Sequence, residues 1–189
     1  IRMAYELFVT PGLVFDYDLA TGERLVRKQR IVKGGYDPSD YVARRMWTTA
    51  RDGAKVPVSL IYRADLEGKA DSDGLPTDGP HPTILYGYGS YEASMDPAFS
   101  IARLSLLDRG IVFAIAHVRG GGEMGRSWYD NGKTLAKKNT FYDFIDVADD
   151  LISRNVTDNK HMVALGGSAG GLLMGAVANR AGELFAGIV

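Results

Sequence analysis

The first 35 residues alternate short strand patterns of apolar and polar positions with turn sequences. The strand patterns cover residues 5–10, 13–18 and 23–30, and Pro11-Gly12 and Thr21-Gly22 separate them. Alternation interrupted by glycine and proline predicts a small antiparallel meander. Because three short strands are marginal by themselves, we expect residues 1–35 to be the edge of a larger β domain.

The next apolar stretches predict a second hairpin. Residues 44–49 and 56–62 have strand character and are joined around Asp52-Gly53, a pair typical of tight hairpin turns. Glycine, aspartate and proline then dominate residues 67–82, which indicates an exposed connection.

From residue 83 onward, strand patterns alternate with helical patterns. Apolar runs of strand length occupy residues 83–86, 111–117 and 162–165, and the run at 111–117 is typical of a strand buried on both faces. Helical spacing occupies residues 98–107, 141–152 (with Thr140 as a candidate N-cap) and 171–180. This repetition predicts an α/β fold with a mostly parallel sheet.

Composition narrows the function classes. The chain has 189 residues, 46% of them hydrophobic, and a formal net charge of −1, which gives no electrostatic case for nucleic acid or an anionic membrane. The lack of cysteine excludes a disulfide scaffold and a thiolate metal site. No apolar run reaches membrane-spanning length, and no secretory signal opens the sequence. The missing signal says little about a chain that is expected to be part of a longer protein, and a cytoplasmic location is our expectation.

The sequence Gly166-Gly167-Ser168-Ala169-Gly170 fits the pattern G-x-S-x-G. A predicted strand precedes it and a predicted helix follows, which is the setting of a nucleophile elbow, a sharp turn that exposes a serine hydroxyl at the top of a sheet. We expect the glycines on steric grounds, since a side chain at either flank would collide with the turn or the substrate. Ser168 is therefore the predicted nucleophile, and the N–H of Ala169 is a predicted oxyanion donor. The alternative is an ordinary glycine-rich turn with an incidental serine.

In such a site the triad acid and histidine follow the serine along the chain. The residues after Ser168 contain one acid, Glu183, and no histidine. We therefore expect the chain to be part of a longer protein, with both triad partners beyond Val189. His81, His117 and His161 show no metal-ligand spacing, and structural or solvated roles are expected for them.

We expect no cofactor and no metal. Residues 120–125 satisfy G-x-G-x-x-G after a strand, but residues 126–132 are not expected to open the amphipathic helix that a dinucleotide site requires. Residues 71–74 contain two aspartates in the spacing of half a calcium loop, without its remaining acidic positions.

Three separated motifs together resemble one known family. They are the elbow at residues 166–171, Leu85-Tyr86-Gly87-Tyr88-Gly89-Ser90-Tyr91, and Arg119-Gly120-Gly121-Gly122-Glu123. In this order and spacing they resemble the prolyl oligopeptidase family of serine peptidases. Three details are similar to its oligopeptidase B branch: alanine after the serine, Ser90-Tyr91, and the stretch 103–110. The resemblance implies that residues 1–35 are the last blade of a seven-bladed β-propeller. It also implies that residues 36–189 are the first half of an α/β-hydrolase domain.

The resemblance also implies roles for two further residues. Tyr88 matches the second tyrosine of the Tyr-Gly repeat, whose hydroxyl donates to the oxyanion in this family; the alternative is a packed aromatic side chain. Asp96 matches an acidic position of a subsite for a second basic residue. Its companion position holds Ala98, which implies a weaker subsite. Asp96 could instead be the N-cap of a helix beginning near Pro97.

These expectations combine into a serine oligopeptidase that hydrolyses short peptides after arginine or lysine through an acyl-enzyme on Ser168. The main acids for that specificity would lie beyond Val189, and residues 1–189 alone would be inactive. Arg119 and Glu123 are expected to be scaffold for the floor of the site. The enzyme alternatives are a prolyl- or acylaminoacyl-specific peptidase or an esterase of the same fold. The non-enzyme alternative is an α/β-hydrolase-like binding module without a triad.

Overall fold

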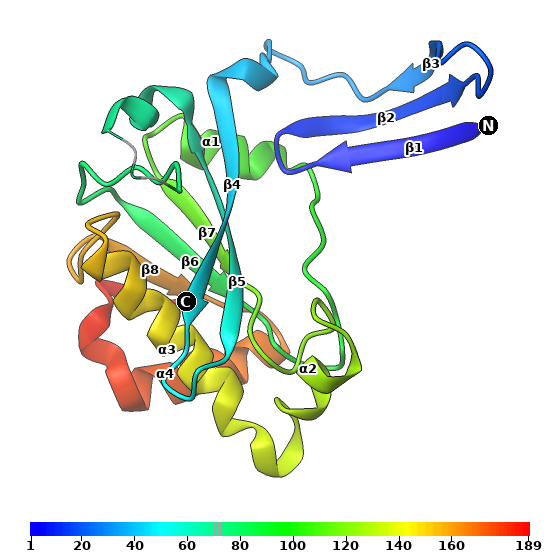
Figure 1. Ribbon diagram of the computed structural model, residues 1–189. Coiled ribbons are helices and arrows are strands. Elements are labelled where there is room, and N and C mark those ends of the chain that lie inside the picture. The colour runs from blue at the N-terminus through cyan, green and yellow to red at the C-terminus, as the bar shows by residue number, and fades with distance from the viewer. Residues whose placement is uncertain (70, 72) are drawn as a thin grey trace.

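The computed structural model describes residues 1–69, 71 and 73–189, which form a three-stranded and a six-stranded sheet (Figure 1). The smaller sheet is antiparallel in the order β1-β2-β3, with β1 at Arg2–Leu7, β2 at Thr10–Tyr17 and β3 at Arg24–Gln29. It projects from the end of the main body where α1 lies, and the side chains of β3 are all exposed. The predicted meander is therefore present.

The predicted turn at Pro11-Gly12 is wrong, because both residues lie within β2. The chain reverses at Phe8-Val9 instead. The Phe8 side chain is only 7% exposed and packs in a cluster with residues of the main body, among them Phe99 and Leu104. Burial of Phe8 against the main body thus accompanies a turn that carries no glycine or proline.

The larger sheet has the strand order β4-β5-β7-β6-β8-β9. Its strands are β4 (Tyr41–Thr49), β5 (Lys55–Arg63), β6 (Thr83–Gly87), β7 (Val112–Ala116), β8 (Met162–Leu165) and β9 (Gly187–Ile188). β4 and β5 run antiparallel to their neighbours, whereas β7, β6, β8 and β9 are mutually parallel. Gly53 has φ +88° in the turn between β4 and β5, in agreement with the predicted Asp-Gly hairpin.

Helices cover both faces of this sheet (Figure 1). The α-helices are α1 (Ile101–Leu107), α2 (Arg126–Asp130), α3 (Lys138–Ser153) and α4 (Ala169–Ala181), and the 3₁₀ turns are η1 (Pro38–Asp40), η2 (Ala64–Lys69), η3 (Thr134–Ala136) and η4 (Gly182–Leu184). Val112, Ala114 and Ala116 of β7 join the apolar cluster that contains α3 and α4. The alternate residues Phe113 and Ile115 join the cluster that contains α1. The predicted fold class, a small antiparallel sheet followed by a mostly parallel α/β sheet, is confirmed.

One helix prediction, the N-cap at Thr140, needs correction. Thr140 is not an N-cap, because α3 begins at Lys138. Thr140 is fully buried, and its hydroxyl donates to the carbonyl oxygen of Arg119 (2.6 Å), with the carbonyl oxygen of Gly132 also within hydrogen-bond distance (3.1 Å). A helix does follow the glycines at residues 120–125, namely α2, but it has only five residues.

The connection between β5 and β6 is only partly exposed. Leu75 has no exposed surface, and the Tyr62 hydroxyl donates a hydrogen bond to the carbonyl of Gly74. Arg154 of the segment after α3 forms ion pairs with Asp73 (2.8 Å) and Asp71 (3.5 Å). The aspartates with calcium-loop spacing thus have a protein cation as partner. Ser72 between them lies outside the described residues.

Candidate active site

Ser168 occupies the sharp turn between β8 and α4. Its backbone has φ 55° and ψ −118°, a conformation that residues other than glycine rarely adopt, and the residue is exposed. Strained conformations of this kind cost about 1–3 kcal/mol each and cluster at functional sites. The Ser168 side chain makes no capping hydrogen bond to α4. The turn therefore presents a hydroxyl that does not serve the helix.

Two glycines of the elbow are required by close backbone contacts. A Cβ atom on Gly166 would lie 2.6 Å from the carbonyl oxygen of Gly170, and a Cβ atom on Gly170 would lie 2.8 Å from that of Gly87. A Cβ atom on Gly167 would meet nothing within 4 Å. The steric expectation thus holds for Gly166 and Gly170, while Gly167 has free space around it.

Tyr88 directly follows β6, the parallel neighbour of β8. A Cβ atom on Gly170 would also lie 3.7 Å from Cα of Tyr88, so the first turn of α4 packs directly on the backbone of this tyrosine. Because β6 and β8 are parallel, Tyr88 and Ser168 both follow the carboxyl ends of their strands, where α/β folds place their sites. Ala169 is the first residue of α4, and its N–H has no partner inside the helix.

A cleft of about 400 Å³ lies beside the elbow. Its lining residues are Tyr86, Ser94, Met95, Asp96, Arg103, Phe113, Ile115 and Leu165. Leu165 ends β8 and Tyr86 lies on β6, so the cleft borders the strands that carry Ser168 and Tyr88. Asp96 is exposed at this cleft.

The interpretation of Asp96 as a helix cap is wrong. The helix begins at Ile101, and its N-cap is Ser100, whose hydroxyl accepts a hydrogen bond from the N–H of Arg103 (3.2 Å). Asp96 lies four residues before this cap and contributes nothing to the helix terminus. Its carboxylate is available to the cleft.

Arg103 gives the same cleft a positive charge. One guanidinium nitrogen donates to the carbonyl of Ala98 (2.9 Å), and the Nε atom is buried without a hydrogen-bond partner among the described residues. Burial lowers the pKa of Arg103. The guanidinium also lies over the rings of Phe8 (5.3 Å) and Phe113 (5.0 Å), so it bridges the small sheet and β7.

The loop between Tyr88 and Asp96 has an unusual backbone. Tyr91 and Glu92 are consecutive residues with φ 60° and φ 57°, and Tyr91 is 77% exposed. Arg126 of α2 pairs with the Glu92 carboxylate at 2.9 Å. Loop residues outside the ordinary φ range persist only when surrounding contacts hold them.

One of those contacts comes from Glu123, whose Oε1 accepts a hydrogen bond from the N–H of Met95 (2.9 Å). The same oxygen lies 3.2 Å from Nδ1 of His117, and Nε2 of His117 lies 2.9 Å from the Ser59 hydroxyl. Burial raises the pKa of Glu123, but the hydrogen bonds from His117 and Met95 outweigh it and bring the value below its usual level.

Glu123, His117 and Ser59 have the residue types of a catalytic triad, yet Ser59 and His117 are each only 2% exposed. A substrate cannot reach a serine hydroxyl at that depth. Ser59, His117 and Glu123 therefore form a buried hydrogen-bonded brace, which links β5, the end of β7 and the loop that carries Asp96. The sequence predicted a structural role for His117, and its contacts are of that kind.

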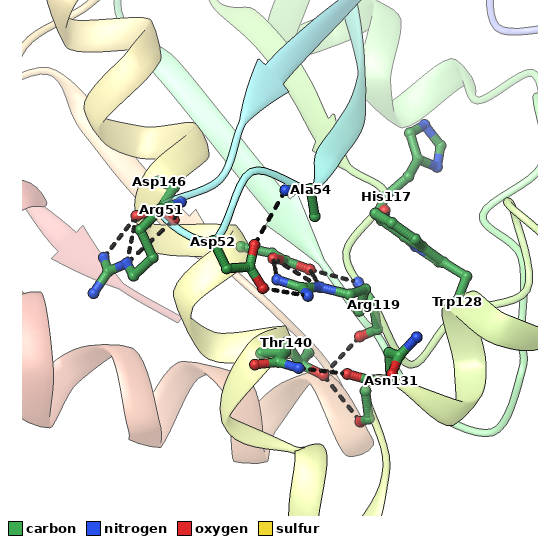
Figure 2. A network of polar contacts seen from close by, with 12 residues as sticks. Arg51, Asp52, Ala54, His117, Arg119, Trp128, Asn131, Thr140 and Asp146 are labelled. Carbon is green, nitrogen blue, oxygen red and sulfur yellow. Dashed lines mark hydrogen bonds and ion pairs between the residues drawn. The ribbon is translucent and has the colours of Figure 1, made fainter.

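Arg119 forms a second buried network next to this brace (Figure 2). Its guanidinium and backbone N–H donate to the carboxylate of Asp143, which has no exposed surface, and its Nη1 donates to Asp52 at 2.6 Å. The hydrogen bond to Asp143 raises the pKa of Arg119 above its usual range. The network ties the β4–β5 turn and α3 to the glycine loop at residues 119–123.

The other histidines are engaged away from the elbow. His81 pairs with Asp78 at 3.0 Å, and His161 pairs with Asp158 at 2.6 Å. Within the described residues, no group of three or more His, Asp or Glu side chains could hold a metal ion. No helix among those residues has the length and apolar character that crossing a membrane requires.

The sequence did not reveal Asp143, Asp52 or Lys137 as parts of the site's support. The Lys137 ammonium donates to the carbonyl of Gly89 (2.6 Å) and the hydroxyl of Ser90 (2.8 Å), immediately after Tyr88. No local pattern marks such a contact, because the partners are 48 and 47 residues apart.

Comparisons with known proteins agree with this geometry. Residues 97–189 match the family model described as the prolyl oligopeptidase family. The chain is 51% identical, over 98% of its length, to the dipeptidyl aminopeptidase BI of Pseudoxanthomonas mexicana, of which it covers 24%. It is 50% identical, over its full length, to the Protease 2 of Moraxella lacunata, of which it covers 26%.

A solved structure is similar over nearly the whole chain. Oligopeptidase B from Trypanosoma brucei, with covalently bound antipain, has a TM-score of 0.87 and 47% identity, and the match covers 99% of this chain and 25% of that one. The chain thus spans about a quarter of the length of these relatives. Its family match, the identity over its full length and the shared fold show that it belongs to the prolyl oligopeptidase family of serine peptidases.

Proposed function

We propose that the protein to which this chain belongs hydrolyses short peptides through an acyl-enzyme on Ser168. The observation that carries this proposal is the strained, exposed position of Ser168 between β8 and α4, the helix whose first turn packs through Gly170 on the backbone of Tyr88. Family membership supports the same chemistry, since a serine peptidase needs an activated hydroxyl and donors for the developing oxyanion.

In the proposed reaction, the Ser168 oxygen attacks the peptide carbonyl while a general base takes the hydroxyl proton. The carbonyl oxygen becomes an oxyanion and accepts hydrogen bonds from the N–H of Ala169 and the hydroxyl of Tyr88. The amine leaves with a proton from the base, and water then hydrolyses the acyl-enzyme. We place the base, a histidine, and its carboxylate partner outside residues 1–189. The engagement of His81, His117 and His161 elsewhere supports this placement.

We further propose a preference for arginine or lysine before the scissile bond, with Asp96 at the adjacent subsite. The exposed carboxylate at the cleft supports this role, because a paired, charge-assisted contact to a guanidinium is stronger than a neutral one. Arg103 lines the same cleft and would oppose a second basic side chain. The preference at this subsite should therefore be mild.

The place of residues 1–35 in the whole protein is also a proposal. The exposed side chains of β3 and the full-length match to a chain about four times longer support their assignment to the last blade of a β-propeller. A cytoplasmic location stays a prediction, which cell fractionation can check.

A second candidate activity comes from the names of the relatives. The 51% identical relative is named dipeptidyl aminopeptidase, which suggests release of dipeptides from a free N-terminus. Another relative, the prolyl endopeptidase of Elizabethkingia meningoseptica, is 37% identical to this chain, and its name suggests cleavage after proline instead. Three fluorogenic substrates separate these activities: an N-blocked peptide ending in arginine, one ending in proline, and an unblocked dipeptide.

The proposal is tested by labelling the full-length gene product with a fluorophosphonate probe. The unaltered protein should be labelled covalently, and Ser168→Ala should abolish labelling while the fold is retained. Lack of labelling in the unaltered protein would refute the enzyme and favour a binding module. Labelling that persists in Ser168→Ala would show that another residue is the nucleophile.

A further inference from the structure

Lys137 lies immediately before α3 and points its ammonium at the segment that follows Tyr88. Its Nζ lies 2.6 Å from the carbonyl oxygen of Gly89 and 2.8 Å from the hydroxyl of Ser90. Two of its three donors therefore hold the two residues that come directly after the tyrosine.

Among residues 1–69, 71 and 73–189, the ammonium of Lys137 has hydrogen-bond acceptors but no carboxylate as an ionic partner. Burial lowers its pKa. A half-buried charge of this kind is costly unless hydrogen bonds compensate it. Its bonds to Gly89 and Ser90 are charge-assisted, which makes them stronger than bonds between neutral groups.

Gly89 is also confined on its other sides. A Cβ atom on Gly89 would lie 2.5 Å from the Thr140 side chain and 2.6 Å from that of Val118, and a Cβ atom on Gly120 would overlap the Gly89 oxygen. Gly89 is thus packed against the glycine loop, and Lys137 donates to the oxygen of the peptide bond between Gly89 and Ser90.

The residues before Tyr88 are held by a different element. The first turn of α4 packs on the carbonyl of Gly87 through Gly170, next to Ser168. Tyr88 is therefore fixed from one side by the helix that carries the elbow and from the other by Lys137. We propose that Lys137 is a positioning residue that holds Tyr88 where its hydroxyl meets the oxyanion. This inference rests on the proposed function.

The test uses the full-length protein and the variant Lys137→Met, which keeps the side-chain length but removes every donor. Lys138→Met is the matched control, since Lys138 is the adjacent lysine and is exposed. Lys137→Met should lower kcat about tenfold or more, with KM within about twofold, because misplaced groups near the reacting atoms cost rate rather than binding. Ser90→Ala removes one acceptor and should give a smaller loss of the same kind.

A double-mutant cycle separates positioning of Tyr88 from a general loss of structure. In a Tyr88→Phe background, where the hydroxyl is already missing, Lys137→Met should cause almost no further loss of kcat. An equal fold-loss in both backgrounds would overturn the inference, as would identical kinetics of Lys137→Met and Lys138→Met in an active protein. Absence of turnover in the unaltered protein would instead be a failure of the proposed function.

Hydrogen exchange gives a readout that does not need turnover. The amides of residues 89–95 should exchange several-fold faster in Lys137→Met than in Lys138→Met, with α3 and α4 unchanged. Equal exchange in the two variants would show that Lys137 does not hold this segment and would overturn the inference.

Discussion

Gly170→Ala adds one methyl group where the helix of the elbow meets the strand end that carries Tyr88. The new Cβ atom would lie 2.8 Å from the carbonyl oxygen of Gly87. Ordinary carbon–oxygen contacts are about 3.3–3.6 Å. The backbone of α4 or β6 must therefore move apart by about 0.5–0.8 Å, since the obstacle is a backbone atom with no rotamer to change.

The expected magnitudes follow from this displacement. Overpacking costs about 1–3 kcal/mol, and alanine in place of glycine within a helix returns up to about 1 kcal/mol. Gly175→Ala is the matched control on the same helix, because its Cβ atom would meet nothing within 4 Å. Gly170→Ala should thus be less stable than Gly175→Ala by about 1–3 kcal/mol. A shift of roughly an ångström near a reacting group can cost about 10²-fold, so kcat should fall at least about tenfold.

The assay compares kcat for a fluorogenic peptide, the fluorophosphonate labelling rate and the urea midpoint of both variants in the full-length protein. Gly175→Ala should match the unaltered protein in kcat and equal or exceed it in stability. If Gly170→Ala behaved like Gly175→Ala, the contact between α4 and β6 would not position the two groups, and the steric reasoning would be refuted.

Four further outcomes are expected. Tyr88→Phe should lower kcat by about 10²–10³ while fluorophosphonate labelling of Ser168 persists; a parental kcat would refute the oxyanion role. Asp96→Asn should reduce cleavage of dibasic peptides more than of monobasic ones, and an equal loss on both would speak against the subsite. Asp143→Asn should lower the free energy of unfolding by about 3–5 kcal/mol, since it weakens the buried pairing of Arg119. Asp130→Asn, at a 46% exposed carboxylate, should leave the urea midpoint almost unchanged in the same titration, and equal losses in the two variants would contradict the figure for Asp143. Residues 1–189 expressed alone should show negligible turnover of a fluorogenic peptide, because each of the three histidines contacts a residue other than Ser168. Robust turnover would contradict this prediction.

Several features of this chain follow from its sequence alone because their causes are local. At the elbow, Gly166 is required by the carbonyl oxygen of Gly170, which is only four residues away. The Asp-Gly pair determines the β4–β5 turn through the positive φ of Gly53. The uninterrupted apolar run of β7 indicates burial on both faces, since neither side of such a strand tolerates water.

Other features were decided by contacts between distant segments. The chain turns at Phe8 rather than at Pro11-Gly12, with Phe8 packed in the cluster that contains α1. The helix after Asp96 begins only at Ile101, although the sequence equally allowed a start near Pro97.

The supports of the candidate site belong to the same class. The hydrogen-bonded residues are far apart in the sequence: Arg119 and Asp52 by 67 positions, Lys137 and Gly89 by 48, and His117 and Ser59 by 58. Periodicity and turn chemistry report the conformation of neighbouring residues only. Which buried polar groups meet depends on how the strands and helices pack, and only the tertiary structure determines that.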